Sequence, residues 1–270
     1  MSTASAHAPH RTARPRPWAP GELEHRLREI AAERYHHRHP FNLRMHDGLL
    51  APEELRCWAL NRFHYQRHIP IKDALILAKL GDRELRRSWI RRIHDHDGRD
   101  GDEPGDAGGI ERWLRLGEAV GLDRVLLLSG EGVLPGVRLA VEGYVNFCRL
   151  GTPLEAIASS LTELFAPDLM VTRIGAWERH YPWSEPDGLR YFQVRVQQGR
   201  RDADEALALV HRWAETRADQ ERVLAAFTFK CDVLWSLLDA VERAATPNVA
   251  APNAGAANVA APDTGAADAG

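Results

Sequence analysis

The chain has 270 residues, 44% of them hydrophobic and 27% charged, and its formal net charge is −3. It is long enough to bury a sizeable core, and the small net charge gives no support for a general nucleic-acid-binding surface. No apolar run reaches the roughly 18 residues of a membrane helix, and the N-terminus lacks the apolar core of a secretory signal. The three cysteines, Cys57, Cys148 and Cys231, stand singly, which excludes a CxxC motif and a disulfide framework. We therefore expect a cytoplasmic protein without membrane or nucleic-acid partners.

Both ends of the chain have the composition of disordered segments. Residues 1–20 are rich in Pro, Arg and His without periodicity, and residues 246–270 contain a near-repeat, NVAAPNAGAA and then NVAAPDTGAA. Such segments cannot bury enough apolar surface to offset the entropy lost on ordering. The sequence predicts an N-terminal arm over 1–20, one folded domain over 21–245 and a low-complexity tail over 246–270.

Between the ends, apolar residues recur with the period of helices, and the alternation typical of strands is absent. Several prolines stand at or near proposed helix ends, where a missing N–H costs least. The predicted helices run roughly over 21–35, 52–69, 72–79, 83–97, 109–120, 135–150, 153–164, 167–180, 188–199 and 202–244. The last of these is two helices or one long curved helix. The sequence thus predicts a single all-α domain.

Cationic side chains fall on or beside the apolar stripes of several predicted helices. A long Arg or Lys at a stripe edge usually reaches water along its aliphatic stem, because a buried ion is costly unless it is paired. A cation on or beside an apolar stripe occurs at six positions, however, which favours a shared function: Arg62, Lys72, Arg92, Arg173, Arg195 and Lys230. Arginine binds carboxylates bidentately. The sequence predicts an interior cavity for a small molecule that carries several carboxylates.

Histidine is dense in two places, residues 36–39 and 94–97. Imidazole can move protons near pH 7, so these rings are candidates for acid–base chemistry. A metal site is the competing interpretation, but HExxH and paired ExxH motifs are absent, and we favour a site without a catalytic metal. The acidic stretch 97–106 lacks the ligand pattern of an EF-hand, and no GxGxxG, Walker A or GxSxG sequence is present.

Eight sequence blocks resemble the pyrroloquinoline-quinone synthase family (PqqC). They are YHHRHPF (35–41), NRFHYQ (61–66), IPIKD (69–73), RIHDHDG (92–98), GGIERWLRLG (108–117), LPGVR (134–138), SSLTELFAP (159–167) and FKCDVLW (229–235). The resemblance follows the order of the chain over about 22–244, so only the two predicted disordered ends lie outside it.

The resemblance implies a helical bundle of the haem-oxygenase-like (PqqC/TenA-like) type that forms a homodimer and binds neither haem nor metal. It also implies the last step in the biosynthesis of pyrroloquinoline quinone (PQQ). In that step O2 oxidises a bicyclic tricarboxylate precursor, with ring closure, an overall eight-electron oxidation and release of hydrogen peroxide. O2 is then a co-substrate and PQQ the product. No cofactor is needed, because electron-rich quinol intermediates can reduce O2 themselves.

Carried over by position, the resemblance implies two groups of site residues. The group that binds carboxylates or quinone oxygens is Arg62, Gln66, Lys72, Arg92, Tyr144, Arg173 and Lys230, and Glu163 is a further polar residue of the site. The group around proton abstraction and the handling of O2 or peroxide is His36, His96, Tyr191 and Arg195. We expect His96 to be the base, and Arg195 and Tyr191 to stabilise the charge of reduced oxygen.

Met170 departs from the family pattern, which usually has His at this position in the oxygen-handling group. A thioether neither donates a strong hydrogen bond nor carries a proton. Three interpretations stay open: a slower but competent enzyme, a site in which another donor substitutes, and a relative that binds quinone without completing the oxidation.

The main hypothesis is a cofactor-independent oxidase that makes PQQ. One alternative is a PQQ-binding carrier or degenerate synthase, for which Met170 is the only support, and another is a metal-dependent oxygenase on the same scaffold. A thiaminase-like hydrolase is disfavoured because this chain has no suitably placed nucleophilic cysteine. Some relatives are fused at their C-terminus to the peptide chaperone PqqD, and the tail resembles such a linker, so PqqD is a further expected partner.

Overall fold

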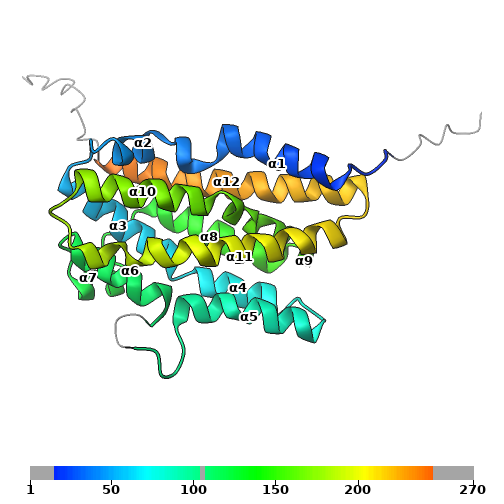
Figure 1. The fold of residues 1–270 in the computed structure, drawn as a ribbon, viewed down its shortest axis with the longest axis horizontal. Coiled ribbons are helices and arrows are strands. Elements are labelled where there is room, and N and C mark those ends of the chain that lie inside the picture. Colours follow the sequence, from blue (N-terminus) through cyan, green and yellow to red (C-terminus); the bar gives the residue numbers. More distant parts are fainter. Residues whose placement is uncertain (1–14, 104–106, 246–270) are drawn as a thin grey trace, which may run out of the picture.

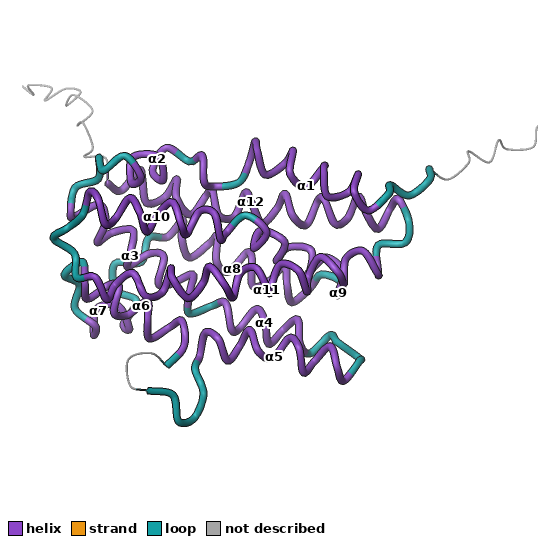
Figure 2. Tube along the Cα trace, in the orientation of Figure 1, coloured by secondary structure: helices purple, strands orange, loops and turns teal. Residues whose placement is uncertain are grey.

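The computed structural model describes residues 15–103 and 107–245. All regular secondary structure in these residues is helical, which confirms the predicted all-α class (Figures 1 and 2). The α-helices are α1 (Pro20–Arg34), α2 (Pro40–His46), α3 (Pro52–Gln66), α4 (Ile69–Leu77), α5 (Arg83–Asp97), α6 (Gly108–Ala119), α7 (Arg124–Ser129), α8 (Pro135–Leu150), α9 (Pro153–Ala158), α10 (Ala166–His180), α11 (Arg190–Trp213) and α12 (Arg217–Ala245). Short 3-10 helices accompany them: η1 (His36–Arg38), η2 (Ser159–Leu164) and η3 (Pro186–Leu189).

The long helices run roughly along the long axis of the molecule (Figure 1). Helix α12 packs against α1, α3, α8, α9 and η2, while α10 packs along α11. Helices α4 and α5 form a hairpin at one edge of the bundle, where α5 also contacts α6 (Figure 1). This packing makes elements that are far apart in the sequence face a shared interior.

A cluster of tryptophans holds α3, α6 and α10 together. Trp58, Trp113 and Trp177 are each 1% exposed. The ring centroid of Trp58 lies 5.5 Å from that of Trp113 and 6.0 Å from that of Trp177. Such pairs add roughly 0.5–1.5 kcal/mol each beyond the burial of their area. The cluster therefore fixes the helices that carry the predicted site residues Arg62 and Arg173.

Helix ends follow their sequence signals. The side chain of Asp82 caps α5 by accepting a hydrogen bond of 2.9 Å from the backbone N–H of Leu85. The helix ends at Gly98, whose φ of 86° favours glycine. At the start of α9, Thr152 and Glu155 form a capping box, in which each side chain accepts from the other's backbone N–H.

The predicted break between 188–199 and 202–244 is wrong, because α11 continues through Gly199 and ends only at Trp213. Gly199 has a packing role instead: a Cβ atom there would lie 3.4 Å from Glu163 Oε2 and 3.5 Å from Pro167. The rest of the predicted last segment is α12, so that segment does contain two helices.

Three further differences concern short elements. The segment predicted as one helix over 153–164 is α9 followed by the tighter η2. Helices α2 and α7 lie in segments for which no helix was predicted. The 3-10 geometry of η2 matters for the site, because it changes the direction in which Glu163 points relative to a continuous α-helix.

Within the described residues, none of the helices combines the length and the apolar character needed to cross a bilayer. The predicted tail and residues 1–14 of the predicted arm lie outside the described residues. Nearer the domain, the guanidinium groups of Arg26 and Arg217 lie 4.2 and 3.8 Å from the Trp18 ring centroid, and the Trp18 backbone N–H donates to Gln220 Oε1 at 2.6 Å. The chain just before α1 is therefore joined to the start of α12.

Candidate functional site

A cavity of about 40 Å3 lies among η1, α3, α4, η2, α10, α11 and α12. This volume is well below the roughly 300–1,000 Å3 that is usual for small-molecule sites. It is lined by Tyr35, His36, Arg62, Tyr65, Gln66, Ile69, Thr162, Glu163, Ala166, Met170, Tyr191, Arg195 and Leu234. Seven of these residues belong to the predicted site, although they come from five separate elements.

The remaining predicted residues lie behind this lining. They are Lys72, Arg92, His96, Tyr144, Arg173 and Lys230, and each is between 1% and 6% exposed. Lys230 and Tyr144 lie against Tyr65 of the wall, and His96 lies near Tyr191. Arg92 and Arg173 are connected to wall residues through Asp202 and Asn42. The structure thus brings the predicted residues into one region of the bundle, while their individual roles stay predictions.

Arg195 and Tyr191, one turn apart on α11, have polar partners from other elements. Arg195 Nη2 donates to Glu163 Oε2 at 2.7 Å, and its Nη1 donates to Asp202 Oδ2 at 3.3 Å. The hydroxyl of Tyr191 donates to Gln66 Oε1 at 2.8 Å. These bonds connect α11 with η2 and α3 along the cavity wall.

Lys230 of α12 lies between two tyrosine rings. Its Nζ donates to the hydroxyl of Tyr65 at 2.5 Å and lies 3.6 Å from the ring centroid of Tyr144. The guanidinium of Arg62 lies 4.2 Å from the ring centroid of Tyr65. Burial, followed by repulsion from Arg62 and Lys72, lowers the pKa of Lys230 well below its ordinary value.

Arg173 and His36 are linked through Asn42. Arg173 Nη2 donates to Asn42 Oδ1 at 3.0 Å, and Asn42 Nδ2 donates to the backbone carbonyl of His36 at 2.7 Å. Burial, and then Arg62, lowers the pKa of Arg173 to about 9. Burial together with Arg62 and Arg173 also lowers the pKa of His36, so its ring is neutral near pH 7.

His96 has the features of a buried neutral base. Its Nδ1 lies 3.0 Å from the backbone carbonyl oxygen of Arg92, so Nδ1 carries the proton and Nε2 keeps its lone pair. Within the described residues, no group hydrogen-bonds to this Nε2. Burial, and then Arg195, lowers the pKa of His96. The ring lies near Tyr191, since a Cβ atom at Gly109 would be 3.4 Å from both rings.

Lys72 and Arg92 have acidic residues as partners. Lys72 Nζ donates to Asp73 Oδ1 at 2.7 Å and to Ser160 Oγ at 3.2 Å. Arg92 donates to the backbone carbonyl of Asp202, whose Oδ1 lies 4.0 Å from Arg92 Nε. These two cations are therefore compensated inside the protein.

Three other buried cations, Arg62, Arg173 and Lys230, form no ion pair with any carboxylate in the part of the chain that the structure describes. Removing one partner from a buried pair typically costs about 3–5 kcal/mol, because a buried charge is left uncompensated. The cavity wall contributes one acid, Glu163, and that acid is paired with Arg195. In the same ranges, no three His, Cys, Asp or Glu side chains could together hold a metal ion. The charge balance favours a bound polyanion.

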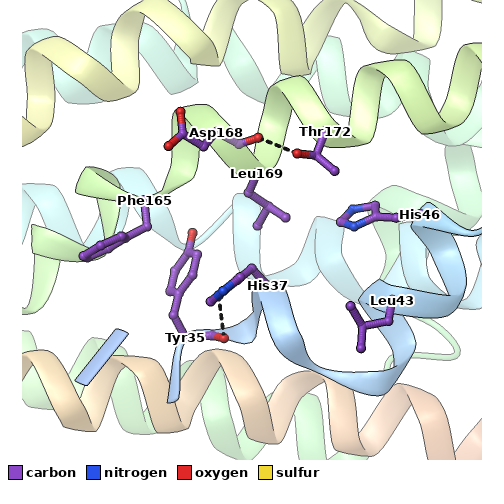
Figure 3. Close-up of a pocket in the computed structure, with 8 residues that line it drawn as sticks. All are labelled: Tyr35, His37, Leu43, His46, Phe165, Asp168, Leu169 and Thr172. Carbon is purple, nitrogen blue, oxygen red and sulfur yellow. Dashed lines mark hydrogen bonds between the residues drawn. The ribbon is translucent and has the colours of Figure 1, made fainter. Parts of the chain in front are cut away.

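A second pocket of about 370 Å3 adjoins the cavity, and Tyr35 lies on the wall of both. Figure 3 shows the side chains that line it: Tyr35, His37, Leu43, His46, Phe165, Asp168, Leu169 and Thr172. On α10, Leu169 lines this pocket and the next residue, Met170, lines the cavity. Burial, and then Arg173, lowers the pKa of His46 to about 4. With no Arg or Lys on its wall, this larger pocket does not suit a polyanion.

Sequence reasoning misses the residues that hold the cations in place. Tyr65 has the spacing of an apolar stripe residue, Asp73 ends the block IPIKD without an assigned role, and Asn42 and Asp202 belong to no motif. A signal existed for Asp73, which directly follows a site lysine. None existed for Asp202, because the predicted break in the helix separated it from Arg195.

Comparisons with known proteins agree on the family. Residues 24–240 match the TENA/THI-4/PQQC family. A pyrroloquinoline-quinone synthase from Pseudomonas putida (strain KT2440) is 51% identical over 228 residues, which cover 84% of this chain and 89% of the relative. One from Pseudomonas aeruginosa (strain PAO1) is 52% identical over 223 residues, which cover 83% of this chain and 87% of the relative.

Two solved structures share the fold. A domain with a heme oxygenase-like fold from Shewanella denitrificans has a TM-score of 0.65 at 17% identity, covering 83% of this chain and 90% of that one. A TenA homolog from Pseudomonas syringae pv. tomato has a TM-score of 0.66 at 14% identity, covering 90% and 100%. At these identities the likeness concerns the fold alone, and it confirms the predicted haem-oxygenase-like bundle. Because the family match spans most of the chain, the protein belongs to the TENA/THI-4/PQQC family and, within it, groups with the pyrroloquinoline-quinone synthases.

Proposed function

We propose that this protein is a pyrroloquinoline-quinone synthase, an enzyme of PQQ biosynthesis. The observation that carries the proposal is a group of three buried cations that pair with no carboxylate of the described residues: Arg62 lines the cavity, and Arg173 and Lys230 lie behind its wall. A tricarboxylate precursor supplies the negative charges that this region needs. The relatives named pyrroloquinoline-quinone synthase, at 51% and 52% identity, support the same assignment.

The proposed reaction is ring closure and an overall eight-electron oxidation of the bicyclic tricarboxylate precursor by O2. A carbon-bound proton has to leave before electrons can pass to O2. The unpartnered Nε2 of His96, in a neutral ring, supports a role as the base that accepts it. Arg195 and Tyr191 are donors on the cavity wall and can stabilise negative charge on reduced oxygen. Since quinol intermediates reduce O2 directly, the proposal needs neither a metal nor a further cofactor.

The second candidate function is a PQQ-binding carrier or a degenerate synthase. Met170 favours it, because a thioether lines the cavity at the position where the family pattern has His. A carrier binds PQQ tightly and does not convert the precursor.

Product formation by the full-length protein distinguishes these functions. The purified protein is incubated with the precursor in air and without oxygen, and the products are identified by mass spectrometry. Oxygen-dependent PQQ over several turnovers supports the synthase. PQQ binding without turnover, or a reduced intermediate that never proceeds to PQQ, supports the carrier or degenerate enzyme. Stoichiometric iron or manganese in the active protein would favour a metal-dependent oxygenase instead.

Two alanine variants separate proton abstraction from oxygen chemistry. His96→Ala is expected to lower turnover by a factor of about 100 or more while PQQ still binds, because it removes the base. Arg195→Ala is expected to stall oxidation at a reduced intermediate, because charge on reduced oxygen loses a donor. Rapid-mixing absorbance and mass spectrometry follow both variants. Unchanged turnover in either one refutes the role assigned to that residue.

Assembly and location are part of the same proposal, and they rest on the family resemblance. We propose a cytoplasmic homodimer with PqqD as a partner. Light scattering of the purified protein tests the dimer, and co-purification with tagged PqqD tests the partner.

A further inference from the structure

Asp202 of α11 is buried and joins three guanidinium groups, those of Arg92, Arg195 and the partly exposed Arg201. It is 2% exposed, and its carboxylate accepts hydrogen bonds from Arg195 Nη1 at 3.3 Å and from Arg201 Nη2 at 2.6 Å. Its backbone carbonyl accepts a hydrogen bond from Arg92 of α5. The proposed reaction does not use Asp202 directly, yet two of its partners, Arg92 and Arg195, belong to the predicted site.

Two arginines of α5 contact two acidic residues of α11, and one of these acids is more deeply buried than the other. Arg91 pairs with Glu205, whose side chain is 25% exposed, and Arg92 reaches Asp202, whose side chain is 3% exposed. The two acids lie three residues apart on α11, so both face α5. Glu205 is therefore a matched control for Asp202: it is an acid that joins the same two helices, but its partner Arg91 does not belong to the predicted site.

Arg195 is shared between two acids on opposite sides. Its Nη2 donates to Glu163 Oε2 at 2.7 Å, and Glu163 lines the cavity. Its Nη1 donates to Asp202, which does not line the cavity. Burial disfavours the charge on Asp202, but Arg92, Arg195 and Arg201 outweigh this effect and lower its pKa to about 2. A permanently charged carboxylate thus competes with Glu163 for Arg195.

We propose that Asp202 is a positioning residue that holds Arg92 and Arg195 in the orientation needed to bind the anionic ligand. Its carboxylate holds one Nη atom of Arg195, which keeps Arg195 from directing both Nη atoms to Glu163. Its backbone carbonyl fixes Arg92 by accepting a hydrogen bond. Arg92 Nε is buried without a hydrogen-bond partner within the described residues, which leaves it free to donate. The inference deepens the proposed function and rests on it for the identity of the ligand, PQQ.

The sign of the change in affinity separates positioning from simple electrostatics. Asp202→Asn removes a negative charge beside an anion site, so a purely electrostatic role makes PQQ bind more tightly. Positioning has the opposite effect, because Arg195 turns to Glu163, and we expect the Kd for PQQ to rise about tenfold or more. Titration of the full-length protein with PQQ, followed by absorbance, measures Kd. Glu205→Gln, the matched control, is expected to change Kd by less than about twofold.

Asp202→Glu keeps the charge but moves the carboxylate by one methylene, and we expect its Kd to rise by about threefold or more. This variant decides the question if Asp202→Asn does not fold. Tighter binding by Asp202→Asn, or an unchanged Kd in Asp202→Glu, overturns the proposal.

A ligand-free crystal structure of either variant is an independent readout. We expect both Nη atoms of Arg195 to contact Glu163, and an unmoved Arg195 overturns the proposal. If the unmodified protein does not bind PQQ, the proposed function fails, and the orientation of Arg195 still decides the role of Asp202.

Discussion

Lys230 and Arg173 are cations that the ligand-free protein buries at an electrostatic cost. Burial and Arg62 lower the pKa of Lys230 well below its ordinary value and the pKa of Arg173 to about 9. An anion bound between them raises both pKa values again, because a nearby negative charge favours the protonated form. Ligand binding and proton uptake at Lys230 are therefore linked.

We expect PQQ binding to take up protons above the lowered pKa of Lys230, where its amine is neutral in the ligand-free protein. Affinity then falls as the pH rises through the lowered pKa of Lys230, by at most about tenfold per pH unit for each proton taken up. Calorimetric titrations in two buffers of different ionisation enthalpy measure this proton number. Lys230→Met should lower it. Lys79→Met, at a lysine that binds the backbone carbonyls of Arg149 and Gly151, should not. An equal proton number in the Lys230 variant and the unmodified protein would contradict the linkage.

Met170 lies on the cavity wall among groups that can carry protons or charge, and its thioether does neither. Met170→His is expected to raise turnover by roughly tenfold or more, because a positioned acid–base group contributes about 100-fold or more. Oxygen consumption together with PQQ yield measures the effect. Met170→Leu, which keeps the size without polarity, should retain the original rate. The absence of any gain in the His variant would mean that another group already supplies the donor.

At the scale of helices, the junction between α5 and α6 determines where His96 lies. Gly108 opens α6 with a φ of 79°. A Cβ atom there would lie 2.4 Å from the backbone nitrogen of Gly98 and 2.5 Å from the backbone oxygen of His96. These are backbone atoms that cannot rotate away, and side-chain-bearing residues rarely adopt such a φ. Only glycine fits at this position.

Gly108→Ala is expected to lower the free energy of unfolding by about 2–4 kcal/mol and to displace His96. Urea denaturation measures the change. Gly199→Ala is the matched control, since its Cβ would approach no atom closer than 3.4 Å. Alanine is favoured over glycine inside a helix by about 1 kcal/mol, so this variant is expected to be more stable than the unmodified protein. Equal stability of the two variants would refute the steric argument.

Helices with strong periodicity and clear end signals could be predicted well. The predicted segment 83–97 coincides with α5, which has an aspartate cap and a terminal glycine. Helices α2 and α7, with seven and six residues, are too short to show a periodic pattern. The break predicted near Gly199 fails because glycine is a weak helix former that is also used for close packing. The sequence does not show whether Gly199 ends a helix or allows close packing; the tertiary structure does, because it places Pro167 against Gly199.

Across the whole molecule, the cations of the site could be predicted and most of their partners could not. A charge on an apolar helix face, such as Lys230, is visible in a one-dimensional pattern. Asn42 and Asp202 look like any other polar residues in the sequence. They contact Arg173 and Arg195 only because the packing of the bundle brings these residues together. The individual roles in the site rest on the family resemblance, which places each residue within a motif.

The folded molecule also buries two neutral imidazoles, and this makes its stability depend on pH. Burial is the largest cause that lowers the pKa of His36 and of His96. In the unfolded chain both rings return to an ordinary pKa near 6.5. Between the ordinary and the lowered pKa the unfolded state binds more protons than the folded state. The free energy of unfolding therefore falls as the pH drops below about 6.5.

We expect each ring to contribute a loss of up to about 1.4 kcal/mol per pH unit below that point. Urea denaturation at about pH 7.5 and about pH 5.5 measures the loss, and His36→Gln should remove the share of one ring. His25→Gln is the control, because the His25 side chain is 70% exposed on α1. A protein equally stable or more stable at the lower pH would show that these rings are not buried in their neutral form. The same neutral form lets His96 accept a proton from the ligand, so the stability profile tests a condition of the proposed chemistry without requiring turnover.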